Sequence, residues 1–154
     1  RYVLTAPRMR VWEALNDTAV LKACIRGCER IEWVGENALE ATVKVNLGPA
    51  PFRVEGVLTL SDMIVAERYT LSGRGKGGWF GWARGSADVV LADHREGTEL
   101  AFTAQGEVAN AIARLGAAFV GRSAQGVIDR FFERFAKAIG ATSRALADPP
   151  GGPV

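Results

Sequence analysis

The feature that most constrains this chain is a change in its hydrophobic period. From about residue 29 to 108, apolar and polar residues alternate, a pattern typical of strands with one buried and one exposed face. From about 109 to 146, apolar residues instead recur every three to four positions, as on a helix that packs on one side. Before the alternation, Thr5-Ala6-Pro7 predicts a helix start with a hydroxyl cap, and Asp17 predicts the cap of a second short helix.

This order predicts the fold class. It comprises a first strand, two short helices, six antiparallel strands separated by turn residues, and a long C-terminal helix. We therefore expect an α+β protein with the helix-grip fold, in which a curved antiparallel sheet wraps around the long C-terminal helix. Residues 1–147 form this predicted domain, and the Pro/Gly-rich residues 148–154 are interpreted as the start of a flexible linker to a C-terminal tail.

Glycines supply the first functional hint, because 18 of the 154 residues are glycine. Several glycines and alanines fall on the predicted inward face of the strands: Gly56, Gly73, Gly75, Gly81, Gly85, Gly106, Ala41, Ala83, Ala87 and Ala104. An inward glycine adds no side chain to the core. The pattern therefore indicates tight sheet curvature, a lipophilic cavity between sheet and helix, or both together.

The predicted cavity is lined by the two short helices, the inward strand positions and the start of the long helix. Its expected lining residues are Trp12, Leu15, Leu21, Ile25, Val45, Phe52, Val54, Leu58, Tyr69, Leu71, Gly73, Trp79, Phe102, Ile112, Leu115, Gly116 and Phe119. Tyr69 is the main polar candidate among them, and the expected lining contains no general base, nucleophile or charged anchor. We thus expect no catalytic residues, and a large apolar ligand with one or two polar atoms.

Aromatic and basic residues gather at one end of the predicted sheet. They are Arg74, Lys76, Trp79, Phe80, Trp82 and Arg114. Rings interleaved with cations suit a membrane interface, and this end would then be the mouth of the cavity. The alternative is a twisted hairpin whose aromatic side chains cover the edge of the sheet.

Charge and composition exclude several function classes. A net charge of +2 argues against nucleic-acid binding driven by bulk charge. One histidine and two cysteines leave too few ligands for a typical zinc site, so no metal site is expected. Cys24 and Cys28 are interpreted as small side chains packed near a helix end, which also fits a reducing compartment. No signal peptide or membrane-spanning run is apparent in the sequence.

Several segments together resemble the CoxG family of carbon monoxide dehydrogenase subunits. They are Val11–Asp17, Val20–Glu29, Val43–Pro49, Tyr69–Gly78, Gly85–Ala87 and Phe131–Phe135, which follow in the family's order. Two features depart from the family pattern. Arg26 stands where proline is common, and Trp79-Phe80-Gly81-Trp82 is more aromatic than usual.

The resemblance implies a START-like (SRPBCC) protein that holds apolar ligands between sheet and long helix. It further implies an accessory protein that attaches a molybdenum–copper carbon monoxide dehydrogenase to the cytoplasmic membrane and links it to respiratory quinones. Our hypothesis is a non-catalytic carrier of a menaquinone-type quinone, without a covalently bound cofactor, peripheral to the inner face of the membrane through a tail beyond Val154. A structural recruiter without ligand and a cyclase-type enzyme are the alternatives.

Overall fold

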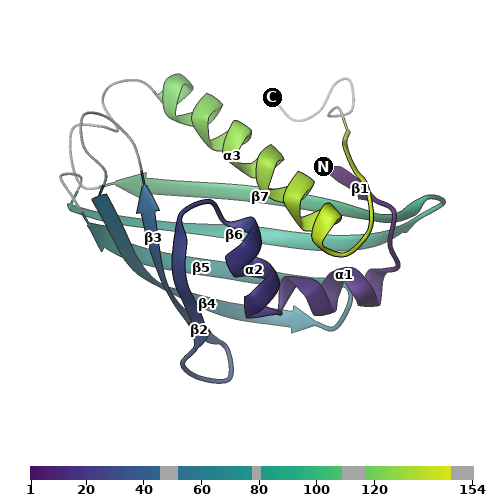
Figure 1. Ribbon diagram of the computed structural model, residues 1–154, viewed down its shortest axis with the longest axis horizontal. Helices are drawn as coiled ribbons and strands as arrows, with labels where there is room; N and C mark the ends of the chain where they lie inside the picture. The colour runs from purple at the N-terminus through teal and green to yellow at the C-terminus, as the bar shows by residue number, and fades with distance from the viewer. Residues whose placement is uncertain (46–51, 78–80, 109–116, 147–154) are drawn as a thin grey trace.

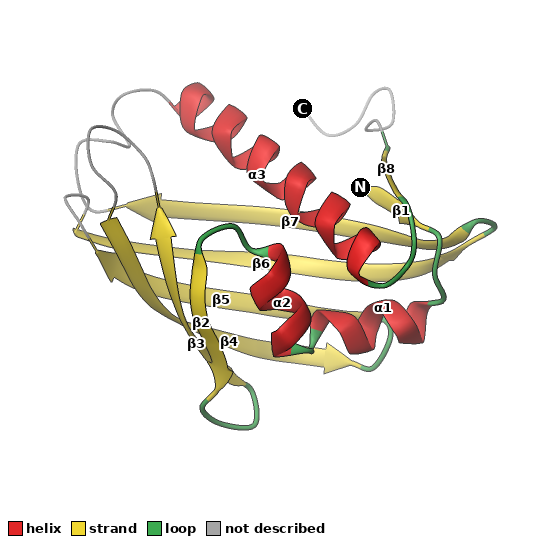
Figure 2. Cartoon of the chain, in the orientation of Figure 1, coloured by secondary structure: helices red, strands yellow, loops and turns green. Residues whose placement is uncertain are grey.

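The computed structural model describes residues 1–45, 52–77, 81–108 and 117–146 (Figure 1). Its elements follow the chain in this order: β1 (Tyr2–Leu4), α1 (Arg8–Leu15), α2 (Thr18–Cys24), β2 (Cys28–Trp33), β3 (Ala38–Val45), β4 (Phe52–Ile64), β5 (Arg68–Gly77), β6 (Gly81–His94), β7 (Gly97–Val108), α3 (Ala117–Ala138) and β8 (Ser143–Ala145). The strands form one curved, unclosed antiparallel sheet, and the three described helices lie against one of its faces (Figure 2).

The order of strands in the sheet is β2-β3-β4-β5-β6-β7-β1-β8. The predicted meander of six strands is confirmed, since β2 to β7 are neighbours in chain order. The pairings Val45↔Phe52 and Gly77↔Gly81 place two connections at one end of the sheet, whereas Ile64↔Arg68 lies at the other end. The predicted α+β class with an antiparallel sheet is therefore correct.

Strand register confirms the predicted inward face. Leu39 and Leu60 are buried on β3 and β4, while their neighbours Glu40 and Ser61 point to the opposite face. On β6, Val89 is 3% exposed and Val90 is 44% exposed, so successive side chains alternate between core and solvent. Burial of one face was readable from the sequence because the side-chain period of a strand is two.

Of the two predicted helix caps, the structure confirms that of α2 but not that of α1. Asp17 caps α2 as predicted, because its carboxylate accepts hydrogen bonds from the backbone N–H groups of Ala19 and Val20. The predicted cap of α1 was wrong, since the N-cap residue is Pro7 and no side chain caps the helix. The Thr5 hydroxyl instead accepts a hydrogen bond from the backbone N–H of Thr142 at 2.8 Å.

The end of the long helix was also predicted wrongly. The apolar period suggested a helix to residue 146, but α3 ends at Ala138. Gly140 takes a φ of +72°, and the N–H of Ala141 bonds the carbonyl of Ala136, as in a glycine-terminated helix. The chain then turns back and adds β8 beside β1. Gly140 was the sequence signal for this helix end, but the apolar residues around it continue the helical period and obscured it.

The core is centred on aromatic side chains of α3. Phe135 is fully buried, and Phe132 packs with ring centroids 4.5 Å from Tyr2 and 6.1 Å from Phe102. The Tyr2 hydroxyl also donates a hydrogen bond to the Asp129 carboxylate at 2.5 Å. These contacts hold the C-terminal half of α3 against β1 and β7.

Curvature explains part of the inward glycine pattern. Gly56 and Gly75 face each other on β4 and β5. A Cβ on Gly75 would lie 2.9 Å from the carbonyl oxygen of Glu55, and one on Gly56 would lie 3.0 Å from that of Arg74. Backbone atoms would therefore obstruct any larger residue, because the two strands approach too closely. These two glycines are explained by sheet geometry without reference to a ligand.

Candidate functional site

The inner face of the sheet carries the described part of the predicted cavity lining. Three of the predicted helical residues, Trp12, Leu15 and Leu21, are buried. The remaining described positions are Tyr69, which is buried, and the partly buried Ile25, Val54, Leu58, Leu71, Gly73 and Phe102. The structure thus brings these predicted residues together on one side of the sheet, under α1, α2 and the C-terminal half of α3.

Other predicted residues lie outside the described part of the chain. These are Trp79, Phe80, Ile112, Arg114, Leu115 and Gly116. Val45, Phe52 and Phe119 belong to β3, β4 and α3, but their side chains are not described. The described residues therefore form the wall of the predicted site that lies nearer α1.

The inner face changes character along the strands. Near α1 it is packed, with Leu91 and Leu100 buried opposite each other on β6 and β7. Further along the same pair, Ala87 is buried but its partner Ala104 is exposed, although both face the helix side. The inner surface is thus accessible at Ala104, on the side of the sheet that carries Gly73 and Gly75.

Tyr69 is the one polar side chain on the inner face over the described spans 54–60, 69–75, 85–91 and 100–104. Its ring meets that of Trp12 edge-on, with centroids 5.5 Å apart. Burial raises the pKa of the Tyr69 phenol to about 12, because desolvation disfavours the phenolate. At neutral pH this side chain is therefore a neutral hydroxyl that can donate a hydrogen bond.

A second surface, which sequence reasoning missed, lies on the outer face of the sheet. Two adjoining hollows of about 760 and 550 Å³ share Val57, Arg74 and Arg84, and we call them the outer groove. The floor of the larger hollow includes Thr59, Ser72 and Ser86, which lie side by side on β4, β5 and β6. These short polar side chains were the sequence feature that could have indicated the groove, because they leave a depression between longer neighbours.

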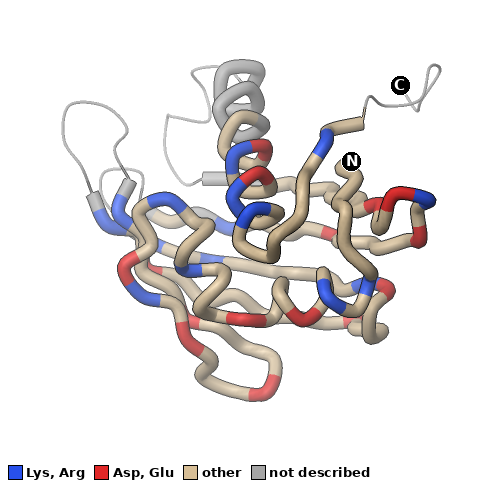
Figure 3. Tube along the Cα trace, turned by 45° about the vertical axis from the view of Figure 1, so that its right-hand side comes forward, with Lys and Arg blue, Asp and Glu red and all other residues tan. Residues whose placement is uncertain are grey.

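Basic residues border the outer groove. Arg74 and Arg84 are direct cross-strand partners. Lys76 and Trp82 are the next pair on the same face, two residues further along the strands. The Arg84 guanidinium lies 5.3 Å from the centre of the Trp82 ring, and Trp82 is 45% exposed. The three described residues predicted for the mouth, Arg74, Lys76 and Trp82, thus share one exposed surface at this end of the sheet. Figure 3 shows in blue how Lys and Arg are distributed along the described chain.

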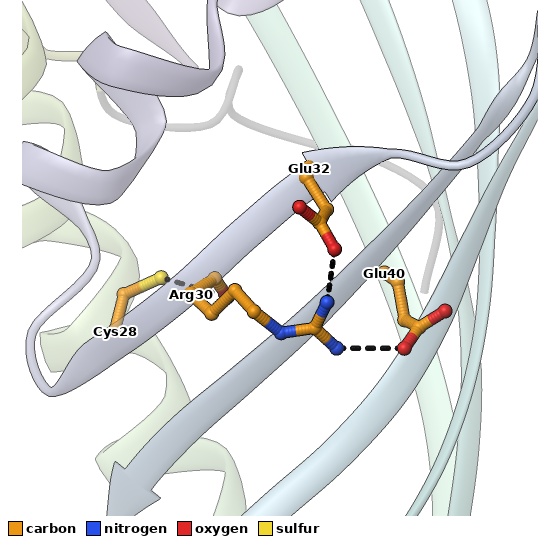
Figure 4. Close-up of polar contacts among 4 residues, drawn as sticks. All are labelled: Cys28, Arg30, Glu32 and Glu40. Atoms are coloured by element: carbon orange, nitrogen blue, oxygen red, sulfur yellow. Dashed lines mark hydrogen bonds and ion pairs between the residues drawn. The ribbon is translucent and has the colours of Figure 1, made fainter.

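Neighbouring charges of the outer face are largely paired. Arg30 on β2 donates hydrogen bonds to Glu32 and to Glu40, the latter at 2.6 Å (Figure 4). Arg53 similarly bonds Glu29 at 2.6 Å and lowers the pKa of that carboxyl through the hydrogen bond. Arg74 and Lys76, in contrast, form no ion pair within the described part of the chain.

The two cysteines were predicted to be small packed side chains. Cys24 is 1% exposed, and Cys28 is partly buried with its thiol 3.5 Å from the carbonyl oxygen of Arg30 (Figure 4). Burial raises the pKa of both thiols, which disfavours the reactive thiolate. Among the described residues, no group of histidine, cysteine, aspartate and glutamate side chains is arranged to hold a metal ion.

Comparison with known families shows the family of this chain. The family model for CoxG, the G subunit of carbon monoxide dehydrogenase, matches residues 3–140, which is most of the chain. The chain belongs to the CoxG family. The family description assigns its members to carbon monoxide dehydrogenase, so membership suggests an accessory protein associated with that enzyme. No protein with a curated description matches the chain.

Solved structures agree with the CoxG chain in fold. A conserved protein from Geobacillus kaustophilus is 24% identical, with a TM-score of 0.82. The match covers 94% of this chain and 97% of the Geobacillus chain. Proteins from Rhizobium leguminosarum (14% identity, 91% and 94% covered, TM-score 0.67) and Thermus thermophilus (19%, 90% and 92%, 0.64) are similar. At these identities the likeness concerns the fold alone.

Four positions bear on the enzyme alternative for this CoxG protein. Arg84 and Asp88 lie on the outer face, where Asp88 accepts a hydrogen bond from the Thr70 hydroxyl at 2.9 Å. The Glu107 side chain is outside the described residues. Asp129 on α3 accepts a hydrogen bond from the Tyr2 hydroxyl of β1, on the helix side of the sheet. Arg84 and Asp88 therefore add no acid or base to the inner face, and the Asp129 carboxylate on the helix side is already bonded to the Tyr2 hydroxyl.

No helix within the described residues is both long and apolar enough to cross a membrane.

Proposed function

We propose that this CoxG protein is a non-catalytic carrier of a lipophilic quinone, of the menaquinone type, for carbon monoxide dehydrogenase. The observation that carries the proposal is the chemistry of the inner face, which is apolar over the described spans 54–60, 69–75, 85–91 and 100–104 except for Tyr69. Membership of the CoxG family supports the choice of enzyme partner. An apolar wall with one neutral polar group suits a large apolar ligand that carries a few polar atoms.

The proposed architecture is a helix grip, with α3 as the helix that the curved sheet encloses. Phe132 and Phe135 pack the C-terminal half of α3 against the sheet. Accessibility at Ala104 supports an approach to the interior from the opposite end of the strands. The ligand would enter there, with its tail along the predicted positions Ile112, Leu115 and Phe119.

A blocking substitution tests this route. Ala104→Trp adds a large side chain on the accessible inner face, so we expect the affinity for menaquinone to fall at least about tenfold, since a filled site excludes the ligand. Thr103→Trp is the matched control, because Thr103 is the exposed neighbour on the outer face. The measurement is titration of purified protein with a short-chain menaquinone, followed by quenching of tryptophan fluorescence.

The same proteins are extracted with organic solvent, and the extract is analysed by mass spectrometry. Recovery of quinone from wild type and from Thr103→Trp, but not from Ala104→Trp, is the expected result. If wild-type protein neither yields quinone nor binds it on titration, the carrier proposal is wrong. Equal affinity in the two variants would instead exclude entry past Ala104.

We further propose that Arg74, Lys76 and Trp82 contact anionic lipid at the inner face of the cell membrane. An exposed tryptophan beside unpaired cations suits the membrane interface, where each basic residue contributes roughly 1 kcal/mol. Reversing two charges, Arg74→Glu with Lys76→Glu, should therefore weaken binding to phosphatidylglycerol vesicles at least about tenfold. Vesicle sedimentation at low ionic strength provides the measurement.

The control for this experiment is Arg68→Glu. Arg68 is exposed on the outer face of β5 but lies at the opposite end of the strand. If Arg68→Glu weakens vesicle binding as much per reversed charge as the double variant, only net charge matters and the proposed surface is wrong. A protein that binds vesicles but never binds quinone would fit the alternative of a structural recruiter.

A further inference from the structure

We propose that the Tyr69 hydroxyl donates a hydrogen bond to a carbonyl oxygen of the bound ligand, with Trp12 positioning the phenol ring. This inference rests on the proposed carrier function and names the group that would recognise the polar end of the ligand. It assigns different tasks to the two ends of the interior. The packed end near α1 recognises the ring carbonyl, and the accessible end near Ala104 admits the ligand.

The first observation is that Tyr69 is a polar side chain with apolar neighbours on the inner face of the sheet. Over the inner positions of the described spans 54–60, 69–75, 85–91 and 100–104, its neighbours are aliphatic or aromatic hydrocarbons, alanine or glycine. The Thr98 hydroxyl, beyond these spans on β7, bonds the carbonyl oxygen of Ala6. Its cross-strand partner on β6 is Val89, which is 3% exposed. A phenylalanine would fill the same volume without placing a hydroxyl in apolar surroundings, so packing alone does not explain the oxygen.

The second observation is that this hydroxyl has no hydrogen-bond partner among the described residues. Tyr69 is only 7% exposed, yet it forms no hydrogen bond within the described part of the chain. No sealed side-chain nitrogen or oxygen among the described residues lacks a hydrogen-bond partner. The Tyr69 oxygen must therefore border accessible space rather than protein atoms. A ligand acceptor in that space would replace a hydrogen bond to water, and such an exchange contributes about 0.5–1.5 kcal/mol.

The third observation is that Trp12 restrains the ring. The two rings meet edge-to-face at 5.5 Å, and Trp12 on α1 is itself 9% exposed. Edge-to-face pairs have a preferred geometry, so the indole limits the orientations that the phenol can adopt. Leu15, on the same helix, is also buried and holds α1 against the core. The hydroxyl is thus held on a rigid element instead of a loop.

The class of acceptor follows from charge. An anionic acceptor beside Tyr69 would find no cation on the described inner strand spans, and burying a charge without a partner is costly. A neutral carbonyl oxygen accepts a hydrogen bond without that cost. Because the phenol stays protonated at neutral pH, it acts as the donor. A ligand with a ring carbonyl and a hydrophobic body would accept the hydrogen bond of the Tyr69 hydroxyl and would contact the apolar residues of the inner face.

The test removes the hydroxyl and keeps the ring. Tyr69→Phe is compared with wild type for two probes: a short-chain menaquinone, and the same prenylated naphthalene without carbonyl oxygens. We expect Tyr69→Phe to bind the menaquinone about 3- to 10-fold more weakly, the effect of one net hydrogen bond. Binding of the naphthalene should not change. Infrared difference spectra should also show a carbonyl stretch at higher frequency in the variant.

Tyr2→Phe is the matched control, because the chain has just these two tyrosines. Tyr2 donates to Asp129, so its variant loses a hydroxyl whose partner is protein. It should lose stability without a change in the ratio of the two affinities. Equal menaquinone affinity and an unchanged carbonyl stretch in Tyr69→Phe would overturn the inference while the carrier function stands. Absence of menaquinone binding to wild type would overturn both.

Discussion

Replacing Phe135 by alanine is expected to lower the free energy of unfolding by about 3–5 kcal/mol. Phe135 has no exposed surface, and its ring lies 6.0 Å from that of Phe131 and 6.3 Å from that of Phe132. Truncation would leave a cavity among stiff rings that cannot collapse to fill it. Because domains are stabilised by only about 5–15 kcal/mol, the variant should be close to unfolded at moderate temperature. Urea titration followed by circular dichroism gives the value.

Lys137→Ala is the control for this loss. Lys137 lies on the same helix but is exposed, so its removal should change stability by less than about 0.5 kcal/mol. A loss of under about 1 kcal/mol for Phe135→Ala would mean that the Phe135 ring is not packed as described. That result would also remove the basis for treating the C-terminal half of α3 as anchored.

The second large effect is expected at Gly27, between α2 and β2. Its φ is +82°, and a Cβ there would lie 2.1 Å from the carbonyl oxygen of Lys44. The same strand position is held by a hydrogen bond from the Lys44 N–H to the Gly27 carbonyl at 2.8 Å. Gly27→Ala must therefore break this contact and should cost more than about 2 kcal/mol.

Gly140→Ala isolates the conformational part of that cost. Gly140 also has a positive φ, +72°, but no atom lies within 4 Å of the place that an added Cβ would occupy. We expect a loss of about 1 kcal/mol from backbone strain alone. Chemical denaturation of both variants measures the difference, which reports the clash with Lys44. Equal losses would show that the approach of Gly27 to β3 is looser than described.

Alternation made the sheet predictable. Each strand from β2 to β7 has one buried and one solvated face, so positions such as Leu39 and Glu40 identify the face without knowledge of the fold. Asp17 was predictable for a similar reason, since a carboxylate before a helix has one favourable local partner. Such features depend on neighbours in sequence.

Features that depend on distant segments were not predictable. Thr5 pairs with Thr142, and β8 joins β1, although both segments carry plausible helical signals of their own. Tertiary pairing outweighed these weak local preferences. The outer groove arises across three strands, from Thr59, Ser72 and Ser86, and becomes visible only when the register is known. The inward face of Tyr69 was readable from the sequence, but only the folded chain shows that its hydroxyl has no hydrogen-bond partner among the described residues.

The short and charged borders of the sheet have a consequence for self-association. Among the described strands, β2 and β8 are the two edges of the open sheet, and exposed strand edges are templates for pairing with other copies. Strand β8 offers only three residues and carries Arg144, which bonds Glu96. Strand β2 has a register shift after Cys28 and presents the charged Glu29 and Arg30. Both borders therefore disfavour edge-to-edge aggregation, an advantage for a protein whose interior surface is apolar and accessible.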